Sequence, residues 1–144
     1  LSHQHQHGLA LSVIVRRAAE GAEELARKVA LAWDVELRAH FEVEERLLFP
    51  SVRERIAEPD SVDRLIGEHR RIEALVAAIR AKPDAARLAE FAEELAAHIR
   101  AEERDLFQQI QAAMAPDEMA ALGERIEAEL ARVCPTTGLP WDDV

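Results

Sequence analysis

Three histidines along the chain are each followed, four residues later, by a glutamate. Residues four apart lie next to each other on one face of an α-helix, so each pair presents an imidazole nitrogen beside a carboxylate oxygen. Each pair falls within the apolar stripe of its own helix, where an unpartnered carboxylate is unfavourable. A shared metal cation is the simplest partner, and such mixed ligands suit iron, manganese or zinc. The pairs are His40 with Glu44, His69 with Glu73, and His98 with Glu102.

Two of these pairs belong to a motif that the sequence repeats. ELRAHFEVEERLLF at residues 36–49 and ELAAHIRAEERDLF at residues 94–107 are identical at nine of fourteen positions, without a gap. The repeat places the same side chains at the same positions of two helices, which indicates a shared role. In the second copy we predict Glu102 rather than Glu103 as the ligand, because Glu102 is in phase with the apolar stripe and aligns with Glu44.

The chain begins with a further group of histidines, HQHQH at residues 3–7. His7 shares a helical face with Leu11, so we predict His7 as an additional ligand. His5 lies on the other side of such a helix and would need a different helix start, and His3 is a turn further out. The choice among the three histidines depends on how the first helix begins.

Glu36 and Glu94 lie four residues before His40 and His98, on the same helix faces. A histidine that binds a metal usually donates its other ring N–H to a carboxylate or a carbonyl. Glu36 and Glu94 are therefore candidates for these outer hydrogen bonds. An equal alternative is that both are exposed charges at the edges of the helices.

Apolar residues recur at helical spacing along most of the chain, which predicts an all-α fold. Four main helices with short connections favour an antiparallel up-down four-helix bundle with a short additional C-terminal helix. Pro50 is expected to end or kink the second helix, Asp84 to cap the fourth, and Pro116 to begin the fifth. We place the helical domain at residues 1–133 and an irregular tail at residues 134–144.

The composition argues against several classes of function. The net charge is −10, with 28 acidic and 18 basic residues, which disfavours nucleic acid and anionic membrane surfaces. No apolar run approaches the roughly 20 residues of a membrane-spanning helix, and no secretory signal is visible. With a single cysteine, Cys134, the chain has no internal disulfide. These features favour a cytoplasmic protein.

The doubled HxxxEERxLF resembles the motif of the hemerythrin-like, HHE cation-binding family, and the resemblance extends from Leu1 to about Met114. It implies a four-helix bundle that holds a non-haem di-iron centre. Ferritin-type bundles instead carry Glu-x-x-His, and no histidine here has a glutamate three residues before it.

The resemblance also implies a role for each predicted ligand in a centre of two non-haem iron ions. The implied ligands are His7 and His40 for one iron, His69, Glu73 and His98 for the other, and Glu44 and Glu102 as bridges. An oxo or hydroxo group, or a water, would complete the bridge. The oxygen-carrying hemerythrins have a histidine where this chain has Glu73, so a carboxylate there would make the centre more negative and favour its ferric state.

We therefore predict a non-haem di-iron protein that interacts with dioxygen, peroxide or a similar small oxidant. Its role would be oxygen or redox sensing, or oxygen or iron handling, and a sensor would act through a protein partner. Two alternatives stay open. One is a di-iron enzyme of the peroxidase type. The other is a structural helical bundle stapled by zinc, since zinc outcompetes ferrous iron at many sites with nitrogen and oxygen ligands. The fifth helix offers either a cap for the bundle or a homodimer contact.

Overall fold

The computed structural model of the chain describes residues 2–17 and 21–134. Within these ranges the regular structure is helical and contains no strand, which confirms the predicted all-α class. None of the helices in these ranges combines the length and the apolar character needed to cross a bilayer. The irregular tail predicted for residues 134–144 lies outside the described residues, except for Cys134.

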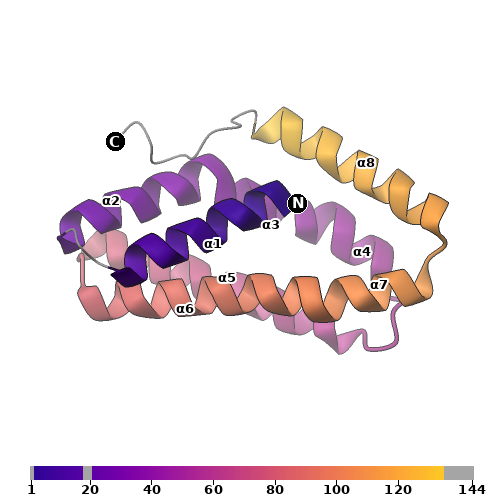
Figure 1. The fold of residues 1–144 in the computed structure, drawn as a ribbon, viewed down its shortest axis with the longest axis horizontal. Coiled ribbons are helices and arrows are strands. Elements are labelled where there is room, and N and C mark those ends of the chain that lie inside the picture. Colours follow the sequence, from indigo (N-terminus) through magenta and orange to yellow (C-terminus); the bar gives the residue numbers. More distant parts are fainter. Residues whose placement is uncertain (1, 18–20, 135–144) are drawn as a thin grey trace.

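Within residues 2–17 and 21–134, five helical segments follow one another (Figure 1). The first is α1 (Ser2–Arg17), the third is α5 (Asp60–Ala81), and the last is α8 (Pro116–Val133). The second and fourth are long helical runs interrupted by π-helical segments, here labelled η. Residues 22–52 comprise α2 (Ala22–Ala32), η1 (Trp33–Leu37), α3 (Arg38–Val43), η2 (Glu44–Leu48) and α4 (Phe49–Val52). Residues 85–113 comprise α6 (Ala85–Ala101), η3 (Glu102–Leu106) and α7 (Phe107–Ala113).

The helices pack side by side around a common interior. Helix α1 lies along α6, and α5 contacts both α6 and α2. Helix α8 lies across the second helical run, where it contacts α3 and η2. Gly8 allows the close approach of α1 to α6, because a Cβ atom at this position would lie 2.7 Å from Ile99 Cδ1. This packing places the start of α1, which carries His5, beside the fourth helical segment.

The apolar core is divided into two clusters, with a polar layer between them. One cluster joins α1, α2, α6 and the second half of α5, with Val29, Ile72 and Phe91 at its centre. The other joins η2, α4, the start of α5, the end of η3 and α8. Each histidine of the three pairs falls where its helix passes from one cluster to the other, since His69, for example, lies between Leu65 and Ile72. The buried polar side chains therefore meet midway along the molecule.

The helix boundaries agree with the sequence in part. Asp84 caps α6, because its Oδ1 accepts a hydrogen bond from Ala86 N at 2.8 Å, and Pro116 is the first residue of α8. The second helical run does not end at Pro50 but continues to Val52. The run is irregular at η2, a wide helical turn that ends two residues before Pro50. Helix α8 has 18 residues, so the additional helix is longer than predicted.

Candidate metal centre

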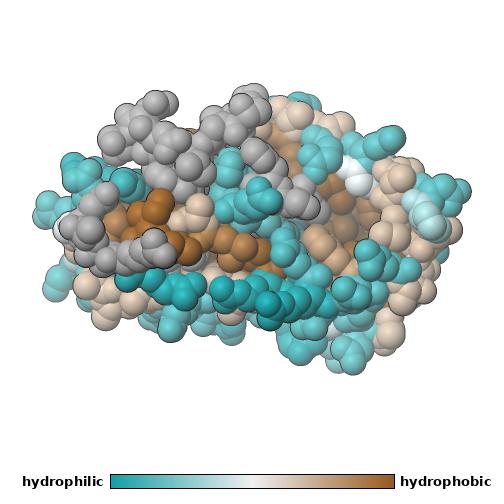
Figure 2. Space-filling view, viewed as in Figure 1, coloured by the Kyte–Doolittle hydropathy of each residue, from teal (hydrophilic) through white to brown (hydrophobic). Residues whose placement is uncertain are grey.

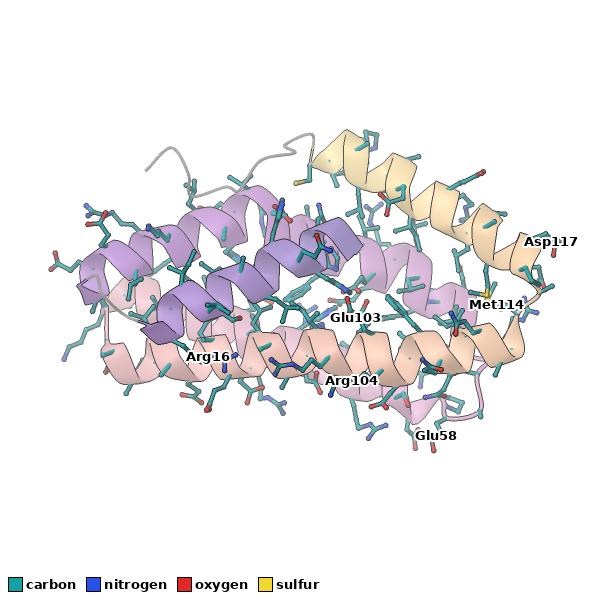
Figure 3. The ribbon with its side chains drawn as sticks, in the orientation of Figure 1. Arg16, Glu58, Glu103, Arg104, Met114 and Asp117 are labelled. Atoms are coloured by element: carbon teal, nitrogen blue, oxygen red, sulfur yellow. The ribbon has the colours of Figure 1, made fainter. Side chains whose placement is uncertain are left out.

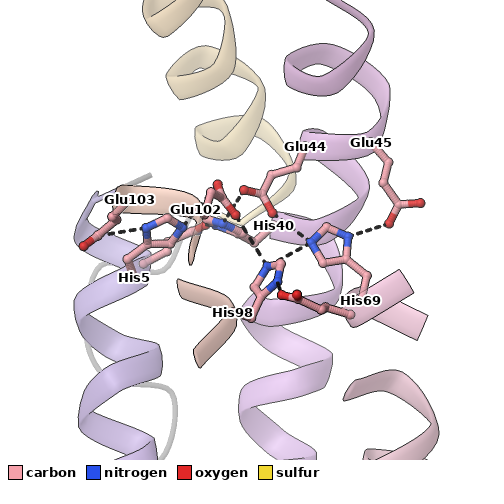
Figure 4. Close-up of polar contacts among 10 residues, drawn as sticks. His5, His40, Glu44, Glu45, His69, His98, Glu102 and Glu103 are labelled. Carbon is pink, nitrogen blue, oxygen red and sulfur yellow. Dashed lines mark hydrogen bonds and ion pairs between the residues drawn. The ribbon is translucent and has the colours of Figure 1, made fainter. Parts of the chain in front are cut away.

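Five of the seven predicted ligand side chains meet in the polar layer (Figure 4). They come from three helical segments, so residues far apart in the sequence share one small volume. All five are buried, and three of them, Glu44, Glu102 and His69, have no exposed surface. The five are His40 on α3, Glu44 at the start of η2, His69 on α5, His98 on α6 and Glu102 at the start of η3.

Together with His5 on α1, these five side chains form two groups that share both carboxylates. In each group, one ligand atom from every residue lies within 4.8 Å of the others. In such an arrangement two cations could each have their own imidazoles and share the same two glutamates. The first group is His5, His40, Glu44 and Glu102, and the second is Glu44, His69, His98 and Glu102.

Each carboxylate faces one imidazole of its own helix and one from another helix. Glu44 lies 3.4 Å from His40 Nε2 and 3.1 Å from His69 Nε2. Glu102 lies 3.4 Å from His98 Nε2 and 3.6 Å from His5 Nε2. The four Nε2 atoms therefore all point toward the carboxylates, in the middle of the layer.

The other ring nitrogen of each of these histidines, Nδ1, bonds to a side chain that lies on the far side of the ring from the two carboxylates. Each Nδ1 donates a hydrogen bond to a side-chain oxygen, which turns Nε2 toward the middle of the layer. The acceptors are Glu103 for His5 at 3.1 Å, Gln4 for His40 at 2.5 Å, Glu45 for His69 at 2.8 Å and Glu68 for His98 at 2.9 Å. Nε2 of His69 and Nε2 of His98 lie 3.1 Å apart and share a hydrogen bond. The imidazoles are thus preorganised as ligands.

The buried atoms of this layer fit a metal better than they fit one another. Both oxygens of Glu44 and of Glu102, and the Nε2 atoms of His5 and His40, are buried and make no hydrogen bond. A buried polar atom without such a partner is unfavourable by about 1–3 kcal/mol, and here these atoms converge on one place. Nitrogen and oxygen donors of this kind suit iron, manganese or zinc. The residues present therefore fit a two-cation site.

The pKa values of the two carboxyls are shifted in opposite directions. Burial and the neighbouring Glu44 carboxylate raise the pKa of Glu102 well above its ordinary value. Burial acts in the same direction on Glu44, but His40, Glu102 and His69 outweigh it, so that the pKa of Glu44 lies well below its ordinary value.

The imidazoles are perturbed in opposite directions. Burial, followed by the charge of His40, lowers the pKa of His5 to about 4. Burial also opposes the charged form of His98, but Glu102 and Glu68 outweigh it and raise the pKa of His98 to about 10. A cation that binds here must displace the protons of Glu102 and His98, so binding releases protons and weakens as the pH falls.

The repeated motif explains how the imidazoles from α1 and α5 are held. In the first copy, Glu45 binds Nδ1 of His69, and the Phe49 ring stacks on the same imidazole with centroids 5.7 Å apart. In the second copy, Glu103 binds Nδ1 of His5, and Phe107 stacks on it at 6.1 Å. Figure 3 shows Glu103 where α1 meets the fourth helical segment. We call each combination of the second glutamate and the phenylalanine a clamp.

Both copies of the motif also carry a π-helical segment that begins at the glutamate facing the centre. In η2 the N–H of Phe49 bonds to the carbonyl of Glu44, and in η3 the N–H of Phe107 bonds to that of Glu102. The wide turn thus lies between the glutamate of the centre and the phenylalanine of the clamp. Single π turns within α-helices are frequent at functional sites. The spacing of apolar residues at the α-helical period does not reveal these π turns.

Two predicted ligands lie outside the centre. His7 is buried, but its Nδ1 donates to both oxygens of Glu36 at 3.0 Å and it belongs to neither group. Glu73 is exposed, with 52% of its side chain accessible, and it pairs with Arg70 at 3.0 Å. His5 joins His40 in the first group instead. The apolar pattern of the first helix had predicted His7, which lies on the other side of that helix.

The predicted outer partners are also placed differently. Glu36 accepts from His7 rather than from His40, and Glu94 lies near Arg71 at 3.4 Å. The outer partners of the imidazoles include the second glutamate of each Glu-Glu pair, Glu45 and Glu103. The two adjacent glutamates in each copy of the motif were the sequence signal for these partners. The first glutamate of each pair faces the centre, and the second faces an imidazole of another helix.

Arg70 provides a matched test of the first clamp. Its guanidinium contacts both Glu45 and Glu73, but only Glu45 also binds His69. Glu45→Ala is expected to weaken metal binding by roughly 10- to 100-fold, the usual effect of losing an outer partner of a ligand. Glu73→Ala removes a similar contact to Arg70 and is expected to leave affinity nearly unchanged. Competition against a chromophoric chelator measures both, and equal losses would contradict the clamp.

The arrangement defines a helical protein with a buried cation site of histidines and glutamates. The sequence matches the Hemerythrin HHE cation binding domain over residues 1–110, so the chain belongs to this hemerythrin family. Comparison with curated proteins and with solved structures gave no match. The chain is therefore a hemerythrin-like cation-binding domain whose histidine and glutamate clusters can hold metal.

Proposed function

We propose that the protein is a non-haem di-iron protein that interacts with dioxygen or a related small oxidant. The observation that carries the proposal is the pair of buried ligand groups that share Glu44 and Glu102. His5 and His40 would hold one iron, and His69 and His98 the other, with the two glutamates as bridges. Bound iron would supply electron transfer to or from the oxidant, and the helices keep bulk water from the site.

The proposed ligand set differs from the predicted one in two residues. His5 replaces His7, because its Nε2 faces Glu102 whereas His7 is engaged with Glu36. Glu73 is left out, because it is exposed and paired with Arg70. The more negative centre expected from Glu73 therefore has no support. The four imidazoles and the two shared carboxylates would supply the mixed nitrogen and oxygen donors that iron accepts.

The proposal includes the arrangement of the helices. Helix α1, residues 22–52, α5 and residues 85–113 would form the antiparallel up-down four-helix bundle, with α8 as the additional helix. The contacts of α1 with α6 and of α5 with α6 and α2 support this arrangement. Ligands projecting inward from each of the four helices are typical of metal sites in such bundles.

The first test is metal content and colour after expression with supplemented iron. We expect two iron ions per chain, one for each ligand group. After anaerobic reduction and exposure to air, a ferric absorption band should appear in the visible spectrum. His40→Ala and His98→Ala each remove a ligand from one group and should lose iron, whereas the surface variant Glu93→Ala should not.

Other outcomes would decide among the alternatives. Zinc as the only metal retained, even after anaerobic ferrous loading, would favour the structural bundle over the di-iron proposal. Sustained peroxide turnover that disappears in His98→Ala would favour the peroxidase-type enzyme. No metal in any form would reject all three.

A further inference from the structure

One of the four imidazoles of the candidate centre has a different kind of outer partner from the others. Nδ1 of His40 donates to the amide oxygen of Gln4 at 2.5 Å, and Gln4 is only 9% exposed. Each of the other three imidazoles donates to the carboxylate of a glutamate. An amide carries no charge, whereas a glutamate is ionised at neutral pH. The side of the centre with His5 and His40 therefore has one anionic outer partner, and the side with His69 and His98 has two.

The single carboxylate beside His5 is also the most exposed of these three outer glutamates. The side chain of Glu103 is 42% exposed, against 26% for Glu45 and 21% for Glu68. Figure 2 shows hydrophilic surface over much of the fourth helical segment, which carries Glu103. Water screens an exposed charge, so Glu103 stabilises a cation less than a buried carboxylate would. Arg70 offsets part of the charge of Glu45, but its side chain is 56% exposed and is screened in the same way.

A small pocket borders the same side of the centre. Its volume is about 10 Å³, which is room for about one water molecule. Both imidazoles of the first ligand group, His5 and His40, line this pocket together with Gln4, whereas the second group contributes only His98. A water molecule in the pocket lies beside the nitrogen ligands of the first group, where it can compete with them for a cation.

We propose that Gln4 makes the His5 and His40 position the exchangeable cation site, while the His69 and His98 position retains its cation. The inference rests on the proposed function, because it requires two cations in the centre. A carboxylate that accepts from a histidine makes the imidazole a more basic ligand, and the neutral amide of Gln4 does so less. The protein then exchanges one cation with the solution while the other continues to join α5 to both π-interrupted runs.

Release of zinc from the loaded protein tests the order in which the two cations leave. Zinc has no redox chemistry, so the test does not depend on a reaction with an oxidant. The protein is loaded with two zinc ions per chain, one for each ligand group, and excess chelator then removes them. We expect two phases of equal size, with the NMR ring signals of His5 and His40 the first to return to their metal-free positions. A single phase, or earlier release from His69 and His98, would overturn the proposal.

Variants of Gln4 test whether its amide sets the rate of the fast phase. Gln4→Glu gives His40 a carboxylate partner and should slow the fast phase by roughly 10-fold, in the range of effects known for outer partners. Gln4→Met leaves Nδ1 of His40 without an acceptor and should speed the same phase. Gln6→Glu adds the same charge to α1 at an exposed position and should release zinc like the wild type. If Gln4 had only a structural role, both of its variants would release zinc faster, and that result would overturn the proposal.

The reciprocal change can be made on the other side of the centre. Glu68→Gln gives Nδ1 of His98 an amide partner in place of a carboxylate. It should speed the slow phase several-fold and leave the fast phase unchanged. Equal effects on the two phases would overturn the proposal, because the outer partners would then not act on separate cations.

The outcomes separate the exchangeable site from the proposed function. Zinc release in the expected order, from a protein whose iron form does not react with dioxygen, would support the exchangeable site and reject the proposed function. Equal release from both positions, in a protein whose iron form does react, would support the function and overturn the exchangeable site. Fewer than two zinc ions per chain at saturation would reject the two-cation centre, and the inference with it.

Discussion

His5→Ala is expected to destroy one of the two proposed metal sites, whereas His7→Ala should leave both intact. Nε2 of His5 faces Glu102 at 3.6 Å inside the first ligand group. His7 instead donates to Glu36, outside both groups. The loss of a direct ligand should exceed the roughly 10- to 100-fold drop in affinity that accompanies the loss of an outer partner. Metal per chain after dialysis against a weak chelator is the measurement.

His7→Ala has a different expected cost. It takes from the buried Glu36 carboxylate its hydrogen bond to His7, which should lower the free energy of unfolding by about 1–3 kcal/mol. His5→Ala should therefore lower the metal content, whereas His7→Ala should lower the free energy of unfolding and keep the metal. Retention of two metals by His5→Ala together with loss in His7→Ala would restore the ligand set that the sequence first predicted.

Glu102→Met is expected to have opposite effects on the metal-free and the metal-loaded protein. The carboxyl of Glu102 has no exposed surface, and burial together with the neighbouring Glu44 carboxylate raises its pKa well above the ordinary value, so its ionised form is unfavourable in the metal-free fold. Methionine has a similar length and is apolar, so in the metal-free protein we expect a gain of about 1–3 kcal/mol in the free energy of unfolding. Because Glu102 belongs to both groups, both cations should be lost, together with the stability that metal binding adds.

Chemical denaturation with and without a chelator measures both effects of Glu102→Met. The exposed Glu93 of the same helix provides the control, since Glu93→Met should change neither metal content nor stability appreciably. A metal-free Glu102→Met protein less stable than the wild type would show that the buried carboxyl is satisfied in a way the contacts do not reveal. Retention of metal would remove Glu102 from the ligand set.

The parts of the centre that the sequence predicted are those set by local spacing. A histidine and a glutamate four residues apart share a helix face whatever the fold, and the repeat identified His40, Glu44, His98 and Glu102 as equivalent. These four side chains, with His69, meet in the structure. The choice of Glu102 over Glu103 matches their placement, since Glu103 faces outward and binds His5.

The parts that the sequence did not predict depend on how each helix is turned about its axis. In α5 the inward position is taken by Ile72, which has no exposed surface, so the next residue, Glu73, faces solvent and pairs with Arg70. In α1, Gly8 packs against Ile99 of α6, and with this face turned inward His5 rather than His7 lies beside Glu102. Packing against neighbours decides such rotations, and one helix's periodicity does not contain that information.

The two clamps work across the molecule. Each half of the chain consists of a helix that carries one imidazole, on α1 or α5, followed by a helical run that carries one copy of the motif. The motif in the first half binds His69 of the second half through Glu45. The motif in the second half binds His5 of the first half through Glu103. This reciprocity is the rule of an isologous two-fold interface, in which each subunit gives the other what it receives. A helical hairpin that paired with its own twin would bring the same kinds of side chains together, so the two clamps have the symmetry of an isologous dimer within a single chain.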